Sequence, residues 1–460
     1  MPLKSGASLL AAAALAGCMQ LAPRYERPPA PVPAAFPDAA SASPEPAEAE
    51  PPWQDYFADP ALRGLIEIAL KNNRDLRIAV LNIDTVRAQY QLRRADQSPT
   101  LNAGLNASRQ PGNNGNMVSS YSAGLSVAAY ELDLFGRVRS LTDSAAAQLL
   151  ATEEARNAVQ ISLIASVAQQ FLALAADDEL LDLTRRTLGT RDESLKLTKL
   201  KFDNGAASEL DQRLAESLVE GARATLAQLQ RQRELDRNAL ALLVGQALPE
   251  LPSGPGRISA IVLSDVPAGL ASDVLLRRPD VRQAEQQLIA ANANIGAARA
   301  AFWPRITLTA SAGVASSQLS NLFKDGAWSF AAQLLQPIFD AGRNSANLAV
   351  AETQREIAVA QYERAIQAAF RDVADALAGR ATLAEQLRAT RAQADAESAR
   401  YRLSELRFQN GVSSTLELLD AQRSLFAAQQ SVIQTQLALL QNRVAVYRAL
   451  GGGGRRATAP

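Results

Sequence analysis

The chain has 460 residues, with 47 basic and 47 acidic side chains, no histidine and a single cysteine, Cys18. The balanced charge gives no attraction to nucleic acid, and the missing histidine removes the commonest general base and zinc ligand. A lone cysteine excludes disulfides within the chain and Cys-rich metal sites. An enzyme is therefore the less favoured class, and no catalytic residue, metal ligand or cofactor is predicted.

The first 17 residues have the pattern of an export signal. Lys4 precedes an apolar run at 9–16 that is too short to span a bilayer as a helix. The run ends in Leu-Ala-Gly followed by Cys18, a sequence that looks like a bacterial lipobox, in which the cysteine is lipidated and becomes the first residue. An ordinary signal peptide with an incidental cysteine is the alternative. We expect a covalent lipid such as palmitate on Cys18, which would anchor the chain.

Residues 18–60 form a Pro-rich lead-in, because 12 of the 22 prolines lie at or before residue 60. This composition predicts extended or irregular chain. A disordered linker and a strap that lies along the body are equally compatible with it.

Residues 74–245 recur about 206 positions later. The sequence FDNG at 202–205 returns as FQNG at 408–411. The duplication predicts one body of two similar halves, 61–245 and 271–451, joined by an equatorial linker at 246–270 and followed by an unstructured tail at 452–460.

Each half contains a long segment without proline that is rich in strong helix formers. These segments predict long helices at 137–203 and 342–409, followed by return helices at about 207–244 and 413–450. An apolar residue recurs every seven positions from Val167 to Phe202, which indicates packing against other helices. At ~1.5 Å per residue, each long helix would be on the order of 100 Å long.

Each predicted helical hairpin turns at an Asn-Gly pair, at Asn204 and Gly205 in the first half and at Asn410 and Gly411 in the second. Glycine just past a helix takes the left-handed conformation that closes the last turn. Such thin hairpins cannot bury their apolar stripes alone, so they must pack together or against other chains.

Four segments alternate apolar and polar residues and predict strands at about 100–109, 119–130, 305–315 and 327–336. Each is about ten residues long, and its apolar side carries no charge over the central residues, as in strands that cross a membrane. Aromatic residues suited to the membrane interface lie near the strand ends: Tyr121, Tyr130, Trp303 and Trp328. Half-buried hairpins of a soluble domain are the alternative.

Four strands cannot close a barrel, and each unpaired backbone group at an open edge costs several kcal/mol in lipid. Neighbouring copies must therefore complete the sheet. Three copies would give 12 strands around a polar lumen, and two copies would give eight strands with a filled interior.

Several motifs together resemble the TolC-like outer-membrane factors, and most closely the NodT/OprM-type lipoproteins. They are the lipobox, the segments 131–137 and 336–343 that enter the long helices, and the segment 411–423 after the second tip. The resemblance covers about residues 15–451. It implies a mainly α protein with a membrane β-barrel: a homotrimer with a 12-stranded barrel, a periplasmic tunnel of 12 helices and an equatorial belt from segments near 180–195, 246–270 and the C-terminal end.

The resemblance also implies a function and its site. The protein would be the outer-membrane exit duct of a tripartite efflux pump for small molecules, with a periplasmic adaptor and an inner-membrane transporter of the RND type as partners. A gate would lie after the second tip, at Leu416, Glu417, Asp420 and Arg423, and the adaptor would contact both Asn-Gly tips. The alternative for this helix face is a solvated Asp420–Arg423 pair of little energetic value.

Other functions remain open at this stage. A type I protein secretion duct would share the same architecture, although the lipobox favours efflux. A periplasmic coiled-coil adaptor or scaffold lipoprotein, and an envelope hydrolase that acts through carboxylates, are the alternatives from other classes.

Overall fold

The computed structural model describes residues 20–36, 52–111, 115–249, 258–264 and 272–452. Cys18, the predicted lipidation site, lies outside the described residues. The chain forms two compact units. Unit 1 comprises 1–30, 80–155 and 280–365, and unit 2 comprises 31–79, 156–279 and 366–460.

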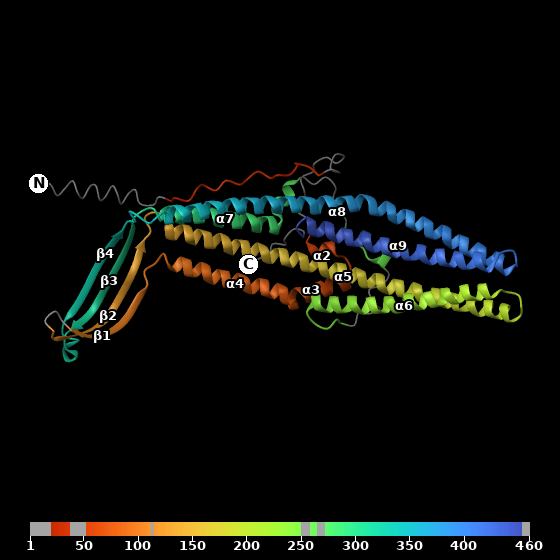
Figure 1. Cartoon of the computed structure of the whole chain (residues 1–460), viewed down its shortest axis with the longest axis horizontal. Helices are drawn as coiled ribbons and strands as arrows, with labels where there is room; N and C mark the ends of the chain where they lie inside the picture. Colours follow the sequence, from red (N-terminus) through yellow and green to blue (C-terminus); the bar gives the residue numbers. More distant parts are fainter. Residues whose placement is uncertain (1–19, 37–51, 112–114, 250–257, 265–271, 453–460) are drawn as a thin grey trace. The chain divides into compact units, whose positions relative to one another are not determined.

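Unit 1 contains a four-stranded antiparallel sheet whose strands follow chain order (Figure 1). The strands are β1 (Leu101–Pro111), β2 (Met117–Leu132), β3 (Arg305–Ser316) and β4 (Gly326–Leu335). All four begin and end within two residues of the predicted ranges. Within the described part of the chain, β1 and β4 are edge strands, each paired on one side.

The strand register gathers the apolar side chains on one face of the sheet. One row across the sheet is apolar and the next is polar: Leu101, Val127, Ala310 and Phe330, then Asn102, Ser126, Ser311 and Ser329. In the polar row, the hydroxyls of Ser311 and Ser329 are 2.7 Å apart and share a hydrogen bond. The period-two pattern therefore produces one apolar and one polar face, as the sequence predicted.

A bulge in β2 keeps the end of this strand in phase with its neighbours. The pairing with β3 shifts between Val127 and Tyr130, and Ala129 has a φ of 53°. Because the bulge inserts one residue, Tyr130 stays on the apolar face with Val127, whereas Glu131 joins the polar face. Unbroken alternation would have reversed both side chains.

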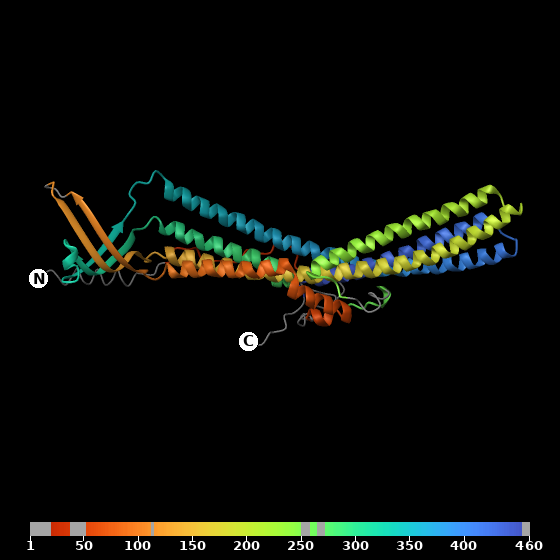
Figure 2. The same ribbon diagram turned by 90° about the horizontal axis from the view of Figure 1, so that it is seen from below.

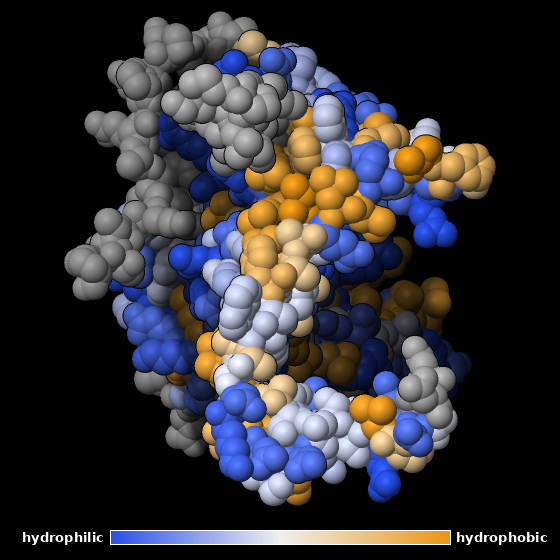
Figure 3. All heavy atoms as spheres, turned by 90° about the vertical axis from the view of Figure 1, so that its left-hand side faces the viewer, coloured by the Kyte–Doolittle hydropathy of each residue, from blue (hydrophilic) through white to orange (hydrophobic). Residues whose placement is uncertain are grey.

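Among the residues that the structure describes, large side chains on the apolar face of the sheet are left exposed. Leu105 is 79% exposed, Trp328 is 82% exposed and Phe330 is 62% exposed. Figure 3, which looks toward the sheet end, shows apolar side chains standing at the surface. Large exposed apolar patches mark contact surfaces for protein or lipid.

The helical hairpins have the lengths that the sequence predicted. The long helices are α5 (Arg137–Asp203) and α8 (Arg343–Gln409), and the return helices are α6 (Glu209–Val244) and α9 (Thr415–Ala449). The return helices begin two residues later than expected. In unit 2, the α5–α6 and α8–α9 hairpins lie side by side (Figures 1 and 2).

Within the described residues, four further α-helices were not assigned from the sequence. They are α2 (Trp53–Tyr56), α3 (Pro60–Asn72), α4 (Arg74–Ala95) and α7 (Pro279–Ala300). Asp59 caps α3 by accepting a 2.9 Å hydrogen bond from the Leu62 backbone N–H. The segment near 180–195, expected to contribute to a belt, lies inside the continuous helix α5.

The core of unit 2 joins α3 to the long helices. Tyr56 and Phe57 pack on Tyr447 of α9, with ring centroids 5.0 and 5.2 Å apart, and Phe171 of α5 is fully buried among them. The predicted heptad stripe is buried at Val167, Leu174 and Leu181, but Phe202 near the tip is 38% exposed. An apolar window of α5 is long enough to cross a membrane, yet half of it is buried inside the chain, as in a core helix.

The lead-in follows the strap alternative where it is described. Within unit 1, Arg27 donates two hydrogen bonds to Glu285 of α7, at 2.7 and 3.1 Å, and Tyr25 donates a third at 3.0 Å. The amide of Asn292 donates to the Pro23 carbonyl at 2.8 Å. Burial and the neighbouring Glu285 carboxylate raise the pKa of Tyr25 above its usual range.

Candidate functional site

The tip of the first hairpin is a left-handed turn closed by side-chain caps. Gly205 has a φ of 72°, and the Asn204 amide donates to the Leu200 carbonyl at 2.7 Å. Ser208 and Asp211 then form a reciprocal capping box that starts α6. The Asn-Gly pair therefore ends α5 as predicted.

The second tip repeats this design. Gly411 has a φ of 71°, and the Asn410 amide donates to the Leu406 carbonyl at 2.7 Å. The Ser414 hydroxyl accepts a 3.3 Å hydrogen bond from the Glu417 backbone N–H and caps α9. Two copies of one sequence thus produce two equivalent turns.

Asp420 is the centre of an ion-pair cluster beside the second tip. Its carboxylate accepts from Arg423 of the same helix at 2.6 Å and from Arg400 of α8 at 2.5 Å. Arg400 also pairs with Glu397 at 3.2 Å. The expected Asp420–Arg423 pair is present, but the bond from Arg400 adds a connection between the two helices of the hairpin.

Glu417 makes a longer contact across the same hairpin. Its carboxylate lies 3.9 Å from the Arg407 guanidinium of α8, and Leu416 beside it is 59% exposed. All these charged groups are partly exposed, so each pair stabilises the tip by roughly 1 kcal/mol at most. Together the pairs nonetheless connect α9 to α8 at two positions along the hairpin, one at Glu417 and one at Asp420.

The two hairpins of unit 2 are also linked to each other near the tips. The Lys201 ammonium lies 3.9 Å from the centroid of the Phe408 ring, a cation–π contact. The Gln422 amide of α9 donates to the Ser194 hydroxyl of α5 at 2.9 Å. Movement of the second tip away from the first would break both contacts.

These contacts join hairpins from the two halves of the duplicated sequence. Comparison with known proteins identifies the family to which this duplicated chain belongs. The profile of the outer membrane efflux protein family matches residues 65–246 and 270–452. The chain belongs to this family.

Individual relatives of this outer membrane efflux protein match over nearly the full length. It is 47% identical over 463 residues to the probable efflux pump outer membrane protein TtgC of Pseudomonas putida, with 98% of this chain and 96% of that protein covered. It is 45% identical over 459 residues to outer membrane protein OprJ of Pseudomonas aeruginosa, with 97% and 96% covered. The solved open state of the MtrE outer membrane channel of Neisseria gonorrhoeae is 42% identical, with a TM-score of 0.88 over 96% of this chain and 100% of that one.

These likenesses confirm the predicted family, the mainly helical fold with an antiparallel sheet, and the outer-membrane location. The cross-hairpin partners of the predicted gate residues in this outer membrane efflux protein, Arg400 and Arg407, were missed from the sequence. A signal for them exists, because residues that face each other in an antiparallel hairpin lie at equal distances from its turn. Arg400 and Asp420 are each about ten residues from Asn410, and Arg407 and Glu417 are each about five residues from the Gly411–Val412 turn.

The predicted interface aromatics lie at different depths along the sheet. Trp303 precedes β3 and stacks on Phe135, with ring centroids 5.0 Å apart, and the Tyr130 hydroxyl donates to the Gln97 carbonyl at 3.1 Å. Tyr121 and Trp328 lie in β2 and β4, toward the opposite end of the sheet. Their placement in a membrane interface stays a prediction.

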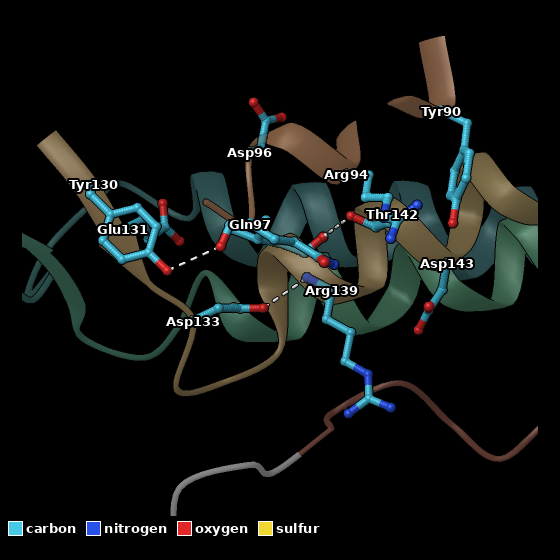
Figure 4. A pocket seen from close by; sticks show the side chains of 11 residues that line it. Tyr90, Arg94, Asp96, Gln97, Tyr130, Glu131, Asp133, Arg139, Thr142 and Asp143 are labelled. Atoms are coloured by element: carbon cyan, nitrogen blue, oxygen red, sulfur yellow. Dashed lines mark hydrogen bonds between the residues drawn. The ribbon is translucent and has the colours of Figure 1, made fainter. Parts of the chain in front are cut away.

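A cavity of about 430 Å³ lies beside Tyr130, where α4 and the start of α5 meet the sheet (Figure 4). Its lining mixes both charges, with Arg94, Asp96 and Asp133 among the residues. In Figure 4 the Arg139 side chain points away from the other lining residues. No group of metal-ligating side chains occurs among the residues that the structure describes.

Proposed function

We propose that this chain is the outer-membrane exit duct of a tripartite efflux pump and that it conducts small molecules without chemical turnover. The observation that carries the proposal is the sheet of unit 1. Its apolar face has no charge over its central residues, and within the described residues its edge strands β1 and β4 are each paired on one side only. Such a sheet is stable in lipid only when other copies close it. The names of the relatives, which include efflux pump and channel proteins, support the same function.

The assembly in this proposal is a homotrimer. Three copies of a four-stranded sheet give 12 strands, enough to leave a lumen lined by the polar rows of asparagine, serine and threonine. A periplasmic adaptor and an inner-membrane transporter of the RND class would complete the pump, with the adaptor lying against the tips at Gly205 and Gly411.

The lipid anchor is a separate part of the proposal. A lipid on Cys18 would hold the start of the strap at the membrane while residues 20–30 lie against unit 1. Metabolic labelling with palmitate should mark the native chain and leave a Cys18→Ser chain unlabelled. Equal labelling of both chains would refute the assignment.

The closed gate, in this proposal, is the tip region where Asp420 and Glu417 are tied to Arg400 and Arg407. Three copies would bring six carboxylates close to one axis, where mutual repulsion favours paired arginines. Opening requires the second hairpin to move outward, so the contacts across the hairpin and between hairpins oppose it.

Conductance in planar bilayers tests this gate. Arg400→Gln and the double change Glu417→Ala with Asp420→Ala should each raise leak conductance severalfold, because they remove the contacts that hold the tip closed. Arg388→Gln is the matched control, since Arg388 pairs with Glu385 of its own helix and its side chain is 70% exposed. Unchanged conductance in both tip variants would remove the gate from Asp420 and Glu417 but would leave the duct in place.

A further inference from the structure

We infer that β4 of one copy pairs antiparallel with β1 of the next in a single register, in which Leu334 lies opposite Leu105 and Gln333 lies opposite Asn106 of the partner copy. This inference rests on the proposed ring of copies and adds the arrangement of residues at its seams. It follows from the internal duplication, because the chain already contains one seam between its two halves.

The proline before the first strand of each half fixes how the halves map onto each other, because Pro99 lies two residues before Leu101 and Pro304 lies two residues before Ile306. In the first half Leu101 pairs with Val127, and in the second half Ile306 pairs with Leu334. Residues of β1 therefore correspond to residues of β3 after 205 positions, since 306 minus 101 is 205. Residues of β2 correspond to residues of β4 after 207 positions, since 334 minus 127 is 207.

The seam between the halves is the pairing of β2 with β3, where Val127 lies opposite Ala310. The equivalent of Val127 is Leu334, 207 positions later. The equivalent of Ala310 is Leu105, 205 positions earlier. Repetition of the internal seam at the edges thus places Leu334 of one copy opposite Leu105 of the next.

The chemistry of the two edges fits this register. Leu105 and Leu334, which are 79% and 63% exposed, would cover each other on the apolar face. Asn106 and Gln333 lie on the polar face and could join their amide groups across the seam. A slip of one residue would place the apolar face of one edge strand opposite the polar face of the other, so the two faces exclude it. A slip of two residues keeps the faces and has to be tested.

Repetition of the internal seam also explains why two residues after β4 are exposed. Ile338 and Phe339 are 96% and 90% exposed within the chain. Their equivalents, Glu131 and Leu132, extend β2 beyond its bulge and pair with Thr307 and Ile306 of β3. Repetition of the seam places Phe339 opposite Leu101 of the next copy, where the two side chains would continue the apolar face.

Paired cysteines test the register in the full-length protein purified in detergent. The predicted pairs are Gln333→Cys with Asn106→Cys, and Leu334→Cys with Leu105→Cys. Successive rows of an antiparallel seam alternate in spacing, so at least one of the two lies in a closely spaced row. The controls are displaced by two residues in opposite directions: Gln333→Cys with Ser108→Cys, and Leu334→Cys with Ala103→Cys. Displaced partners are roughly 7–8 Å apart, beyond the usual reach of a disulfide.

Oxidation should convert at least one predicted pair to covalent dimers and trimers on non-reducing gels and leave the displaced pairs monomeric. Single-cysteine variants control for Cys18. Cross-linking of a displaced pair in place of both predicted pairs would overturn the register and leave the duct intact. Light scattering of the uncrosslinked protein reports the oligomer independently, and a monomer there would overturn the proposed function itself.

Discussion

Asp177 is a buried carboxyl group on α5, and one of its oxygens has no hydrogen-bond partner among the described residues. Burial, followed by the Asp236 carboxyl, raises the pKa of Asp177 to about 7. The neighbouring Arg233, which lowers this pKa, is held 2.5 Å from Asp178. A buried carboxyl group near a second carboxyl group is most stable when it is protonated. The helices of the first hairpin are therefore sensitive to pH at this residue.

The sign of the pH dependence follows from the raised pKa. In the unfolded chain the pKa of aspartate is about 3.9, so between pH 4 and 7 the folded chain binds more protons than the unfolded chain. Stability should fall as pH rises through this range and level off above it. Asp177→Asn mimics the protonated acid, so its melting temperature should exceed that of the parent at pH 8 and match it near pH 4.

Thermal melting of the detergent-purified protein at a series of pH values measures this difference. Asp182→Asn is the control, because Asp182 lies on the same helix in an exposed pair with Arg186. Parallel melting curves for the parent and Asp177→Asn across the whole pH range would contradict a raised pKa at Asp177.

Among the helices, the long ones were predictable and the shorter ones were not, for a physical reason. α5 and α8 are proline-free, carry strong helix formers and end at Asn-Gly, so local preferences and the fold agree. On α4, Leu81 and Leu92 are 53% and 67% exposed within the chain. The apolar residues of this helix do not form one continuous stripe, which is the pattern by which amphipathic helices are recognised from sequence.

The candidate site also has a part that was predictable from the sequence and a part that was not. The turns at Gly205 and Gly411 depend on neighbouring residues, so their positions follow from sequence. Arg400 reaches Asp420 across the hairpin. Their equal distances from the turn place them opposite each other, but no local residue preference indicates that their side chains meet. The β2 bulge at Ala129 was also missed, because alanine gives no sign of a positive φ.

Two glycines of the hairpins separate backbone conformation from packing. Gly411 has a φ of 71°, whereas Gly221 lies within α6, and an added Cβ would meet nothing within 4 Å at either position. Gly411→Ala should destabilise the second tip by about 1 kcal/mol, because alanine resists the left-handed conformation. Gly221→Ala should stabilise α6 by about 0.5–1 kcal/mol.

Hydrogen exchange of the backbone amides at 412–418 and 218–224 measures these two effects. Exchange should become faster at the second tip in Gly411→Ala and slower around residue 221 in Gly221→Ala. Equal protection at the tip with glycine or alanine would mean that the turn does not need its left-handed residue.

For the molecule as a whole, the two faces of the sheet meet different surroundings in the assembled duct. The apolar face carries exposed leucine and aromatic side chains, and the polar face carries serine, asparagine and glycine. Gly124 and Gly313 lie opposite each other on the polar face, and a Cβ on either would collide with the backbone of the other strand. The two strand backbones are therefore in close contact at these glycines. Substitutions that test the two faces are better made in neighbouring rows, where an added side chain does not meet the other backbone.

Leu125 and Ser126 offer a matched pair, because they are adjacent in β2 and point to opposite faces. Leu125 is half exposed on the apolar face opposite Ala103 and Ala312, and Ser126 lies on the polar face opposite Asn102 and Ser311. If lipid covers the apolar face, Leu125→Arg should cost about 2–4 kcal/mol near the bilayer midplane. The amount of heat-modifiable protein in outer-membrane fractions should then fall sharply, whereas Ser126→Arg should assemble normally and reduce single-channel conductance by adding bulk to the lumen. If Leu125→Arg assembled as well as Ser126→Arg, the apolar face could not lie in lipid, and the sheet would have to be covered by protein instead.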